Sequence, residues 1–188
     1  MTELILIRHG QTEWNQIKRY QGHTDIPLND TGIDQALQLA ERLHSTPLEA
    51  VYTSDLQRAF LTASYLADSR SLVPVIDQRL REINHGQWEG MLHGDIQRLF
   101  PDHLARFDKD PINAAAPGGE TIGQLQQRML KAVNDIICGF PNGPVAVVSH
   151  GLALATLLAQ QQEGSLNHVF DLIPENAVPV YLQINIPL

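Results

Sequence analysis

The stretch Leu4-Ile5-Leu6-Ile7-Arg8-His9-Gly10 decides the fold of this chain. Four consecutive apolar residues bounded by polar ones predict a buried strand. The strand ends in a cation, an imidazole and a glycine, and Gly10 allows a sharp turn and the close approach of a ligand. Because ligands of open α/β sheets bind at the carboxyl ends of strands, Arg8 and His9 are candidate site residues.

The same pattern recurs far along the chain, where Val145-Ala146-Val147-Val148 is followed by Ser149-His150-Gly151. If the two strands are parallel neighbours, His9 and His150 should face each other across one crevice. A single His-Gly pair after a strand is usually no more than a turn. Two such pairs, one of them directly preceded by an arginine, favour a catalytic site.

Length and composition are typical of one soluble globular domain, which we expect over residues 1–188. The net charge of −8 lacks the basic footprint of a nucleic-acid-binding protein. The only cysteine, Cys138, excludes an intramolecular disulfide and a four-cysteine zinc site. We find no signal-peptide core and no stretch of membrane-spanning length, so we expect a cytoplasmic protein without membrane contacts. The sequence leaves the oligomeric state open.

Predicted strands and helices alternate along the chain. This alternation predicts an α/β fold, a three-layer α/β/α sandwich with a mostly parallel central sheet. Ser54 with Gln57 and Thr121 with Gln124 are typical capping boxes at helix starts. Pro74 should place the third strand at an edge of the sheet. The predicted strands cover residues 4–7, 50–53, 72–76, 145–148, 168–173 and 178–186, and the predicted helices cover 33–43, 55–66, 95–100, 122–136 and 152–158.

Prolines and glycines are frequent in residues 101–119, which predicts a loop there. Residues 91–119 are therefore the best candidate for an insertion that covers a site and selects its substrate. Four basic side chains of this segment could contact a substrate, although facing solvent is the commoner role of each: His93, Arg98, Arg106 and Lys109.

Two further charged side chains could complete a phosphate site. Arg58 falls in the first turn of a helix that follows a strand, and helix N-termini attract anions. Its guanidinium suits phosphate oxygens, although a lone arginine is more often solvated or ion-paired. Glu82 could give a proton to a leaving oxygen beside a bound phosphate, whereas a loop glutamate on its own is usually solvated.

Other phosphate and metal chemistries lack their sequence signatures. The chain contains no Gly-x-x-x-x-Gly-Lys-Ser/Thr, Gly-x-Gly-x-x-Gly or His-Glu-x-x-His run. Pro144 stands six residues after Cys138, where a cysteine-dependent phosphatase loop requires arginine. Asp108-Lys109-Asp110 is not preceded by an apolar strand, which argues against an aspartyl-phosphate site.

Taken together, these motifs resemble the histidine phosphatase superfamily, also called phosphoglycerate-mutase-like. The similarity spans almost the whole chain and follows the family's order. The matching stretches are residues 6–15, 22–28, 52–59, 82–90, 117–121 and 148–151.

The resemblance implies a role for each central residue. His9 would be the nucleophile that becomes phosphorylated, and Glu82 would be the general acid and then the general base. Arg8, Arg58 and a positively charged His150 would hold the phosphoryl group. No metal ion and no organic cofactor is implied, and the partner would be a small phosphorylated metabolite. The further phosphate- or substrate-binding residues would be Asn15, Gln21, Gly22 and Gly151.

The residues after Glu82 bear on the reaction type. Mutases of this family are longer and usually carry Arg-His-Tyr after that glutamate, whereas Ile83-Asn84-His85 stand there in this chain. The sequence is therefore more similar to the short phosphatases, whose substrates include α-ribazole phosphate and sugar phosphates and some of which have broad specificity. A phosphoglycerate-mutase-type phosphotransferase and a phosphate-binding regulator without turnover are the alternatives.

Overall fold

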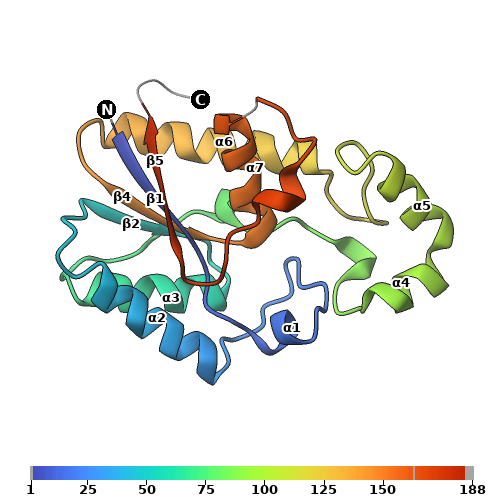
Figure 1. Cartoon of the computed structure of the whole chain (residues 1–188), viewed down its shortest axis with the longest axis horizontal. Coiled ribbons are helices and arrows are strands. Elements are labelled where there is room, and N and C mark those ends of the chain that lie inside the picture. The colour runs from blue at the N-terminus through green and yellow to red at the C-terminus, as the bar shows by residue number, and fades with distance from the viewer. Residues whose placement is uncertain (1, 163, 185–188) are drawn as a thin grey trace.

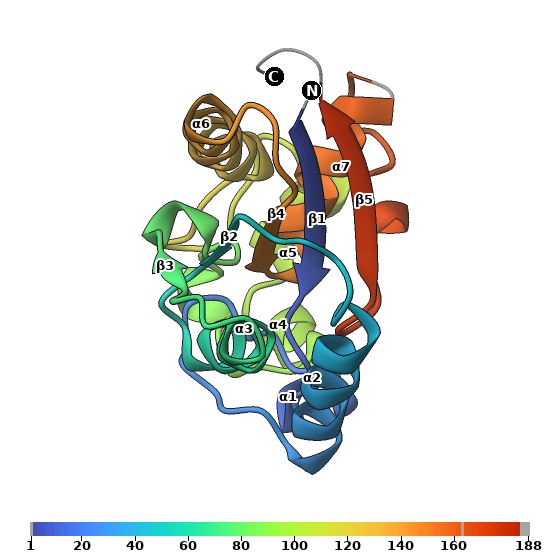
Figure 2. The ribbon, with the colours of Figure 1, turned by 90° about the vertical axis from the view of Figure 1, so that its left-hand side faces the viewer.

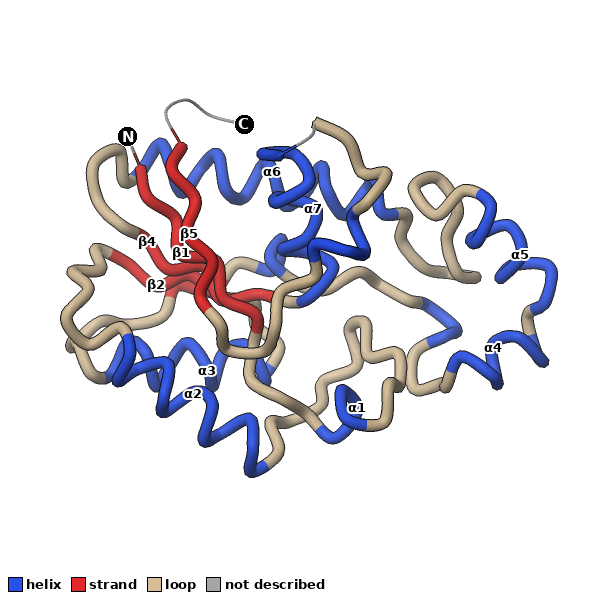
Figure 3. Tube along the Cα trace, in the orientation of Figure 1, coloured by secondary structure: helices blue, strands red, loops and turns tan. Residues whose placement is uncertain are grey.

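The computed structural model describes residues 2–162 and 164–184, which fold around one five-stranded sheet (Figures 1 and 3). The strand order is β3-β2-β4-β1-β5, with β5 antiparallel to β1 and the other neighbours parallel. The predicted mostly parallel α/β sheet is therefore confirmed. The strands are β1 (Thr2–Arg8), β2 (Ala50–Thr53), β3 (Val75–Ile76), β4 (Val145–Ser149) and β5 (Pro179–Ile184).

Helices cover both faces of the sheet, with α6 and α7 on one face and α2 and α3 on the other (Figure 1). Successive side chains of a strand point to opposite faces. Leu4 and Leu6 of β1 accordingly pack in the core against α6 and α7, while Ile5 and Ile7 pack against α2 and α3. The predicted three-layer sandwich is confirmed. These helices are α2 (Asp30–Arg42), α3 (Gln57–Asp68), α6 (Ile122–Gly139) and α7 (Gly151–Gln162).

Residues 91–119, which we call the cap segment, lie beyond one end of the sheet (Figure 3). They carry α4 (His93–Leu99) and α5 (Pro101–Lys109), which share a small core. The prediction of a loop over 101–119 is wrong for α5. Proline is well tolerated at the first position of a helix because its missing N–H has no intrahelical partner there, so Pro101 begins a helix. The core side chains are Trp88, Ile96, Leu104 and Ala116.

The predicted capping boxes have different outcomes. Thr121 and Gln124 form the expected box at the start of α6. Ser54 does not cap a helix, because α3 begins at Gln57 after Leu56, which makes no side-chain cap. The Ser54 hydroxyl bonds instead to a side chain of another strand end, described below.

Two strand predictions need correction. Residues 168–173 contain a 3₁₀ helix, η3 (Val169–Leu172), whose residues 169 and 172 pack beside α7 at the three-residue period of that helix. The third strand is limited to β3, and it lies at the predicted edge, opposite β5 (Figure 2). Of the last predicted strand, residues 185 and 186 lie outside the described residues.

Three short elements complete the part of the chain that is described: α1 (Glu13–Gln16), η1 (Gln78–Leu80) and η2 (Gly86–Trp88). None of the helices in residues 2–162 and 164–184 is long and apolar enough to cross a membrane.

Candidate active site

The carboxyl ends of β1 and β4 bring two histidines together. Arg8 and Ser149 are paired in register, so the next residue of each strand is a histidine at the same edge. The ring centroids of His9 and His150 are 5.1 Å apart, with the ring planes inclined by 59°. The two residues are 3% and 0% exposed. The local strand-His-Gly pattern and the parallel pairing therefore produce one buried imidazole pair.

The His9 ring has a defined tautomer. Its Nδ1 lies 2.7 Å from the carbonyl oxygen of Gly10, and because a carbonyl only accepts, Nδ1 carries the proton. Nε2 is then left with its lone pair. Burial, followed by the charges of Arg58 and Arg8, lowers the pKa of His9 well below its ordinary value, so the ring is neutral at pH 7. A neutral imidazole with a free nitrogen is a competent nucleophile.

Arg58 is a fully buried cation whose guanidinium group donates to backbone carbonyl oxygens. Nη1 donates to the carbonyl of Thr24 and Nη2 to that of Gly22, each at 2.8 Å. Burial lowers the pKa of Arg58 to about 10, which the charge of Glu82 partly opposes, so the group stays cationic at pH 7. No ion pair of Arg58 occurs among the described residues, and a cation this deep in the protein favours an anion beside it.

Arg8 is held in a similar way. Its Nη1 donates to the carbonyl of Pro174 at 3.0 Å, and its backbone carbonyl accepts from the N–H of Ala177 at 2.8 Å. Burial lowers the pKa of Arg8, and the charge of Glu82 again opposes this effect. Both arginines are thus within the electrostatic reach of the same carboxylate.

The His150 ring is bonded on one side only. Its Nε2 lies 2.7 Å from the Ser54 hydroxyl. Burial, followed by the charges of Arg58 and His9, lowers the pKa of His150 well below its ordinary value. The expected positive charge on His150 therefore does not hold for the unliganded site. A bound phosphate dianion would raise this pKa again, because an opposite charge favours the imidazolium.

Glu82 points its carboxylate at the N-terminus of α7. Oε1 accepts from the N–H groups of Ile83 at 2.9 Å and Ala153 at 3.0 Å, and Oε2 accepts from that of Leu152 at 3.2 Å. Backbone donors and the helix dipole both suit an anionic side chain at this position. The carboxylate is therefore fixed relative to α7, the helix that directly follows His150.

Asn15 and Gly22 each have a structural role, and Gly22 contacts Arg58 of the site. The Oδ1 atom of Asn15 accepts from the N–H and hydroxyl of Thr12 in the capping box of α1, which leaves Nδ2 as its only possible donor to a ligand. Gly22 has a φ of +55°, and a Cβ there would meet Glu89 Oε1 at 2.2 Å. This glycine turn is what presents the Gly22 carbonyl to Arg58.

Gln21 and Gly151 also lie close to these groups. Gln21 precedes the Gly22 turn and is buried. Gly151 begins α7, and a Cβ at this position would approach the guanidinium carbon of Arg8 to 3.4 Å. Arg8 therefore packs against the start of the helix, and the nearest neighbour of such a Cβ would be Ile173 Cγ2 at 3.1 Å.

Three buried nitrogen atoms of this site have no hydrogen-bond partner among the described residues: Arg8 Nε, Arg58 Nε and His150 Nδ1. Buried polar atoms are normally bonded, so three such atoms around two cations mark a site suited to an anion rich in oxygen acceptors. No cluster of metal-ligating side chains occurs within residues 2–162 and 164–184.

Several residues that support the site are not evident from the sequence. The Asn176 amide donates to the His9 carbonyl at 2.7 Å, and the Thr62 hydroxyl accepts from the Gly10 N–H at 3.0 Å. These contacts join residues far apart in the chain, and no local pattern predicts them. Ser54 had a usable signal, because it follows β2, which is the neighbour of β4 in the sheet.

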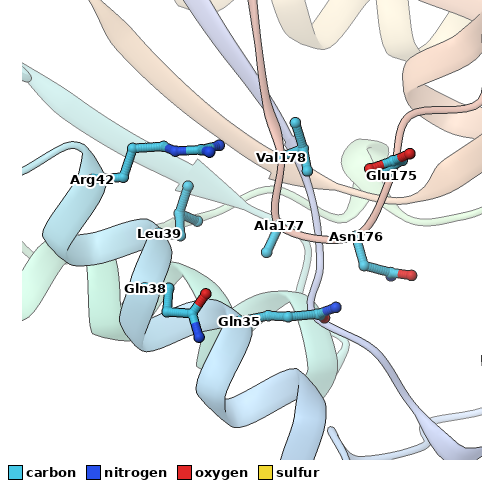
Figure 4. A pocket seen from close by; sticks show the side chains of 8 residues that line it. All are labelled: Gln35, Gln38, Leu39, Arg42, Glu175, Asn176, Ala177 and Val178. Carbon is cyan, nitrogen blue, oxygen red and sulfur yellow. The ribbon is translucent and has the colours of Figure 1, made fainter.

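A cavity of about 250 Å³ lies between α2 and the loop that carries Asn176 (Figure 4). It is lined by Gln35, Gln38, Leu39 and Arg42 of α2 and by residues 175–178, of which Asn176 also bonds to the His9 carbonyl. The cavity therefore adjoins the imidazole pair through Asn176.

A second cavity, of about 480 Å³, lies in the cap segment and is lined in part by Arg106 and Lys109. None of the residues around the two histidines lines it. His93 lies 3.5 Å from the Tyr20 hydroxyl, and Arg98 forms an exposed ion pair with Asp95. The structure therefore does not bring these four basic side chains together at the imidazole pair.

The fold and the site define an α/β protein that places a neutral histidine beside a buried anion site. Residues 4–185 match the histidine phosphatase superfamily (branch 1). The chain is 34% identical over 157 residues to phosphoserine phosphatase 1 of Hydrogenobacter thermophilus, covering 84% of this chain and 74% of that protein. It is 36% identical over 163 residues to the probable phosphoglycerate mutase GpmB of Yersinia pestis, covering 85% and 74%.

Solved structures agree with these similarities. YhfR of Bacillus stearothermophilus superposes with a TM-score of 0.90 at 35% identity, covering 98% of this chain and 92% of that chain. The α-ribazole phosphatase of Shigella flexneri superposes with a TM-score of 0.90 at 27% identity, covering 97% and 91%. The chain belongs to the histidine phosphatase superfamily, branch 1, as its motifs indicated.

Proposed function

We propose that this protein is a metal-independent phosphatase that hydrolyses small phosphomonoesters through a phosphohistidine at His9. The observation that carries the proposal is the neutral His9 ring with Nε2 free, next to buried cationic and imidazole nitrogens that lack partners. Such a site can bind a phosphoryl group and attack it in line.

In the first step, His9 Nε2 attacks phosphorus and the bond to the leaving oxygen breaks. The phosphoryl transition state carries its charge on three equatorial oxygens, which Arg8, Arg58 and His150 would stabilise. A protonated Glu82 would give its proton to the leaving oxygen, and an alcohol departs.

In the second step, water attacks the phosphohistidine and Glu82 takes the proton of that water. The P–N bond breaks, inorganic phosphate leaves, and the neutral His9 ring is restored. The position of the Glu82 carboxylate at the start of α7, within electrostatic reach of both arginines, supports one group in both steps. Asn15, Gln21, Gly22 and Gly151 would line the same phosphate site.

We place the chemistry in one domain over residues 1–188, with the cap segment as an insertion that selects the substrate. The small core that α4 and α5 share with Trp88 supports this division, and Phe107 of α5 joins it to the main core. Phosphoserine, α-ribazole phosphate and sugar phosphates are the substrates to test, because relatives of this chain are phosphoserine and α-ribazole phosphatases.

The similarity to GpmB favours a second candidate, a phosphoglycerate-mutase-type phosphotransferase. Against it, Ile83-Asn84-His85 follow the glutamate where such mutases usually carry Arg-His-Tyr. The third possibility, a phosphate-binding regulator, would have the same pocket and no turnover.

The test is phosphate release from a panel of phosphorylated metabolites and p-nitrophenyl phosphate, before and after exhaustive chelation. We expect release without a bisphosphate primer, unchanged by chelation, because the arginines and His150 supply the charge that a metal would provide. Activity that returns only with one divalent ion would contradict the metal-independent mechanism. Isomerisation of a phosphoglycerate that requires a bisphosphate would favour the mutase, and binding without turnover would favour the regulator.

A further inference from the structure

The backbone of Glu82, as distinct from its carboxylate, is held by two side chains from other parts of the chain. The Glu82 carbonyl accepts from Arg128 Nη2 at 2.7 Å and from His23 Nε2 at 2.8 Å. The backbone of the proposed acid therefore has its own support, separate from the contacts of its carboxylate.

Arg128 lies on α6 and bonds to several backbone carbonyls of residues 79–82, the segment that leads to Glu82. Its Nη1 donates to the carbonyls of Arg79 at 2.7 Å and Arg81 at 2.6 Å. Its Nε and Nη2 donate to the two carboxylate oxygens of Glu120 at 2.7 and 2.8 Å. Only a planar guanidinium has enough N–H donors in the right directions for all of these contacts.

Glu120 extends the same support to the residues after Glu82. The N–H of Asn84 donates to Glu120 Oε2 at 3.2 Å, and the N–H of Glu120 donates to the Asn84 carbonyl at 2.8 Å. The pair of Arg128 and Glu120 therefore fixes the chain on both sides of Glu82. Their side chains are 20% and 16% exposed, so water competes little for these bonds.

The two ends of Glu82 are thus tied to two helices. Its carboxylate is bonded to the start of α7, and its backbone is bonded to Arg128 on α6. Helices α6 and α7 pack in the same core, which makes the distance between the two anchors rigid. A proton donor misplaced by 1 Å can lose about 10²-fold in rate, so rigid support of this kind matters for catalysis.

We propose that Arg128, held by Glu120, is the positioning residue for Glu82, and that it keeps the carboxyl group within reach of the leaving oxygen. The proposal deepens the proposed function and rests on it. Arg128 touches no reacting atom. Its loss should therefore impair proton transfer by Glu82 and leave phosphoryl binding by Arg8 and Arg58 in place.

The test compares two substrates whose leaving groups differ in their need for a proton, glycerol 2-phosphate and p-nitrophenyl phosphate. Arg128→Lys keeps the charge and loses the planar fork. We expect a fall in kcat of about 10–100-fold for glycerol 2-phosphate and a much smaller fall for p-nitrophenyl phosphate, with similar KM for both. In a Glu82→Gln background, Arg128→Lys should cause little further loss, because both changes remove the same step.

Arg79→Met is the matched control. Arg79 lies in the same segment and pairs with Asp77 and Asp135, yet its side chain does not bond to Glu82. We expect Arg79→Met to change kcat equally for the two substrates, as a general loss of stability would. If Arg128→Lys does not fold, Glu120→Gln carries the same comparison, because it removes the ion pair and keeps the size of the side chain.

Equal losses for both substrates in the Arg128 or Glu120 variant would overturn the positioning role, and so would full additivity with Glu82→Gln. Failure of the proposed function would give a different result from failure of the positioning role. In that case Glu82→Gln itself would show no dependence on the leaving group, and the inference would fall with it.

Discussion

The phosphate site and the cap segment are built in opposite ways. His9, His150 and Arg58 are at most 3% exposed, and each is bonded to a residue from a distant part of the chain. The cap segment has a small core completed by Trp88, an exposed ion pair and a cavity lined in part by basic side chains. The rigid site suits the phosphoryl chemistry common to all substrates, and the separate cap suits the choice among them.

The largest expected effect concerns the covalent step, which tests the rigid site directly. Brief exposure to a good phosphate donor, followed by quenching in alkali, should trap an acid-labile phosphohistidine that peptide mapping places at His9. His9→Ala should abolish the adduct, because the Gly10 contact at Nδ1 leaves the His9 lone pair on Nε2 for attack on phosphorus. His150→Ala should slow its formation without moving it.

Comparing His9→Ala with His150→Ala decides which histidine is the nucleophile and which one binds the phosphoryl group. An adduct on His150, or efficient turnover by His9→Ala, would reverse the assignment of nucleophile and phosphate ligand even though the two rings lie together as described.

The next effect concerns proton transfer. Glu82→Gln keeps the shape of the side chain but cannot transfer a proton, so we expect kcat to fall on the order of 10²–10⁴-fold for alkyl phosphates. The fall should be smaller for p-nitrophenyl phosphate, whose leaving group needs less protonation. Phosphate binding, measured by product inhibition, should change little. Equal losses for alkyl and nitrophenyl phosphates would make Glu82 a structural residue.

The phosphate site could be predicted from the sequence to a greater extent than the cap segment. The imidazole pair could be predicted because both signals are local, an apolar run followed by His-Gly, and parallel strands align their ends. The cap segment could not, because Pro101 reads as a helix breaker and begins a helix. Ser54 reads as a cap, yet its partner is 96 residues away.

Arg128 shows most clearly which contacts cannot be predicted from the sequence. Its carbonyl partners at Arg79 and Glu82 are 49 and 46 residues away, and nothing near Arg128 in the sequence distinguishes it from a solvated arginine on a helix. Contacts of this kind are set by how α6 packs on the sheet, which is a property of the whole fold.

A third prediction uses the buried, neutral histidines of the rigid site. Burial and nearby cations lower the pKa of His9 and of His150, so below pH 6.5 the unfolded chain binds protons that the native state does not. The free energy of unfolding should therefore fall as the pH falls, by about 1 kcal/mol per histidine at pH 5.5. Urea unfolding between pH 7 and 5.5 measures this.

The control is the double variant His9→Gln/His150→Gln, which has no titrating ring at either position. Its free energy of unfolding should fall less than that of the unaltered protein over the same pH range. The same fall in both proteins would mean that other groups, and not the imidazole pair, set the pH dependence.

The smallest expected effect tests the cap segment. Arg106 and Lys109 line a cavity that no residue of the phosphate site lines, so their charges should not act on the transferred phosphoryl group. The double variant Arg106→Gln/Lys109→Gln should change kcat for p-nitrophenyl phosphate by no more than about twofold, the range of an ordinary surface substitution.

Arg98→Gln, which loses the exposed pair with Asp95, is the control. If the double variant alters KM for one phosphorylated metabolite and the control does not, the cavity contributes to substrate choice. A large fall in kcat for p-nitrophenyl phosphate would instead show that the cap takes part in the chemistry, and the separation of the two regions would fail.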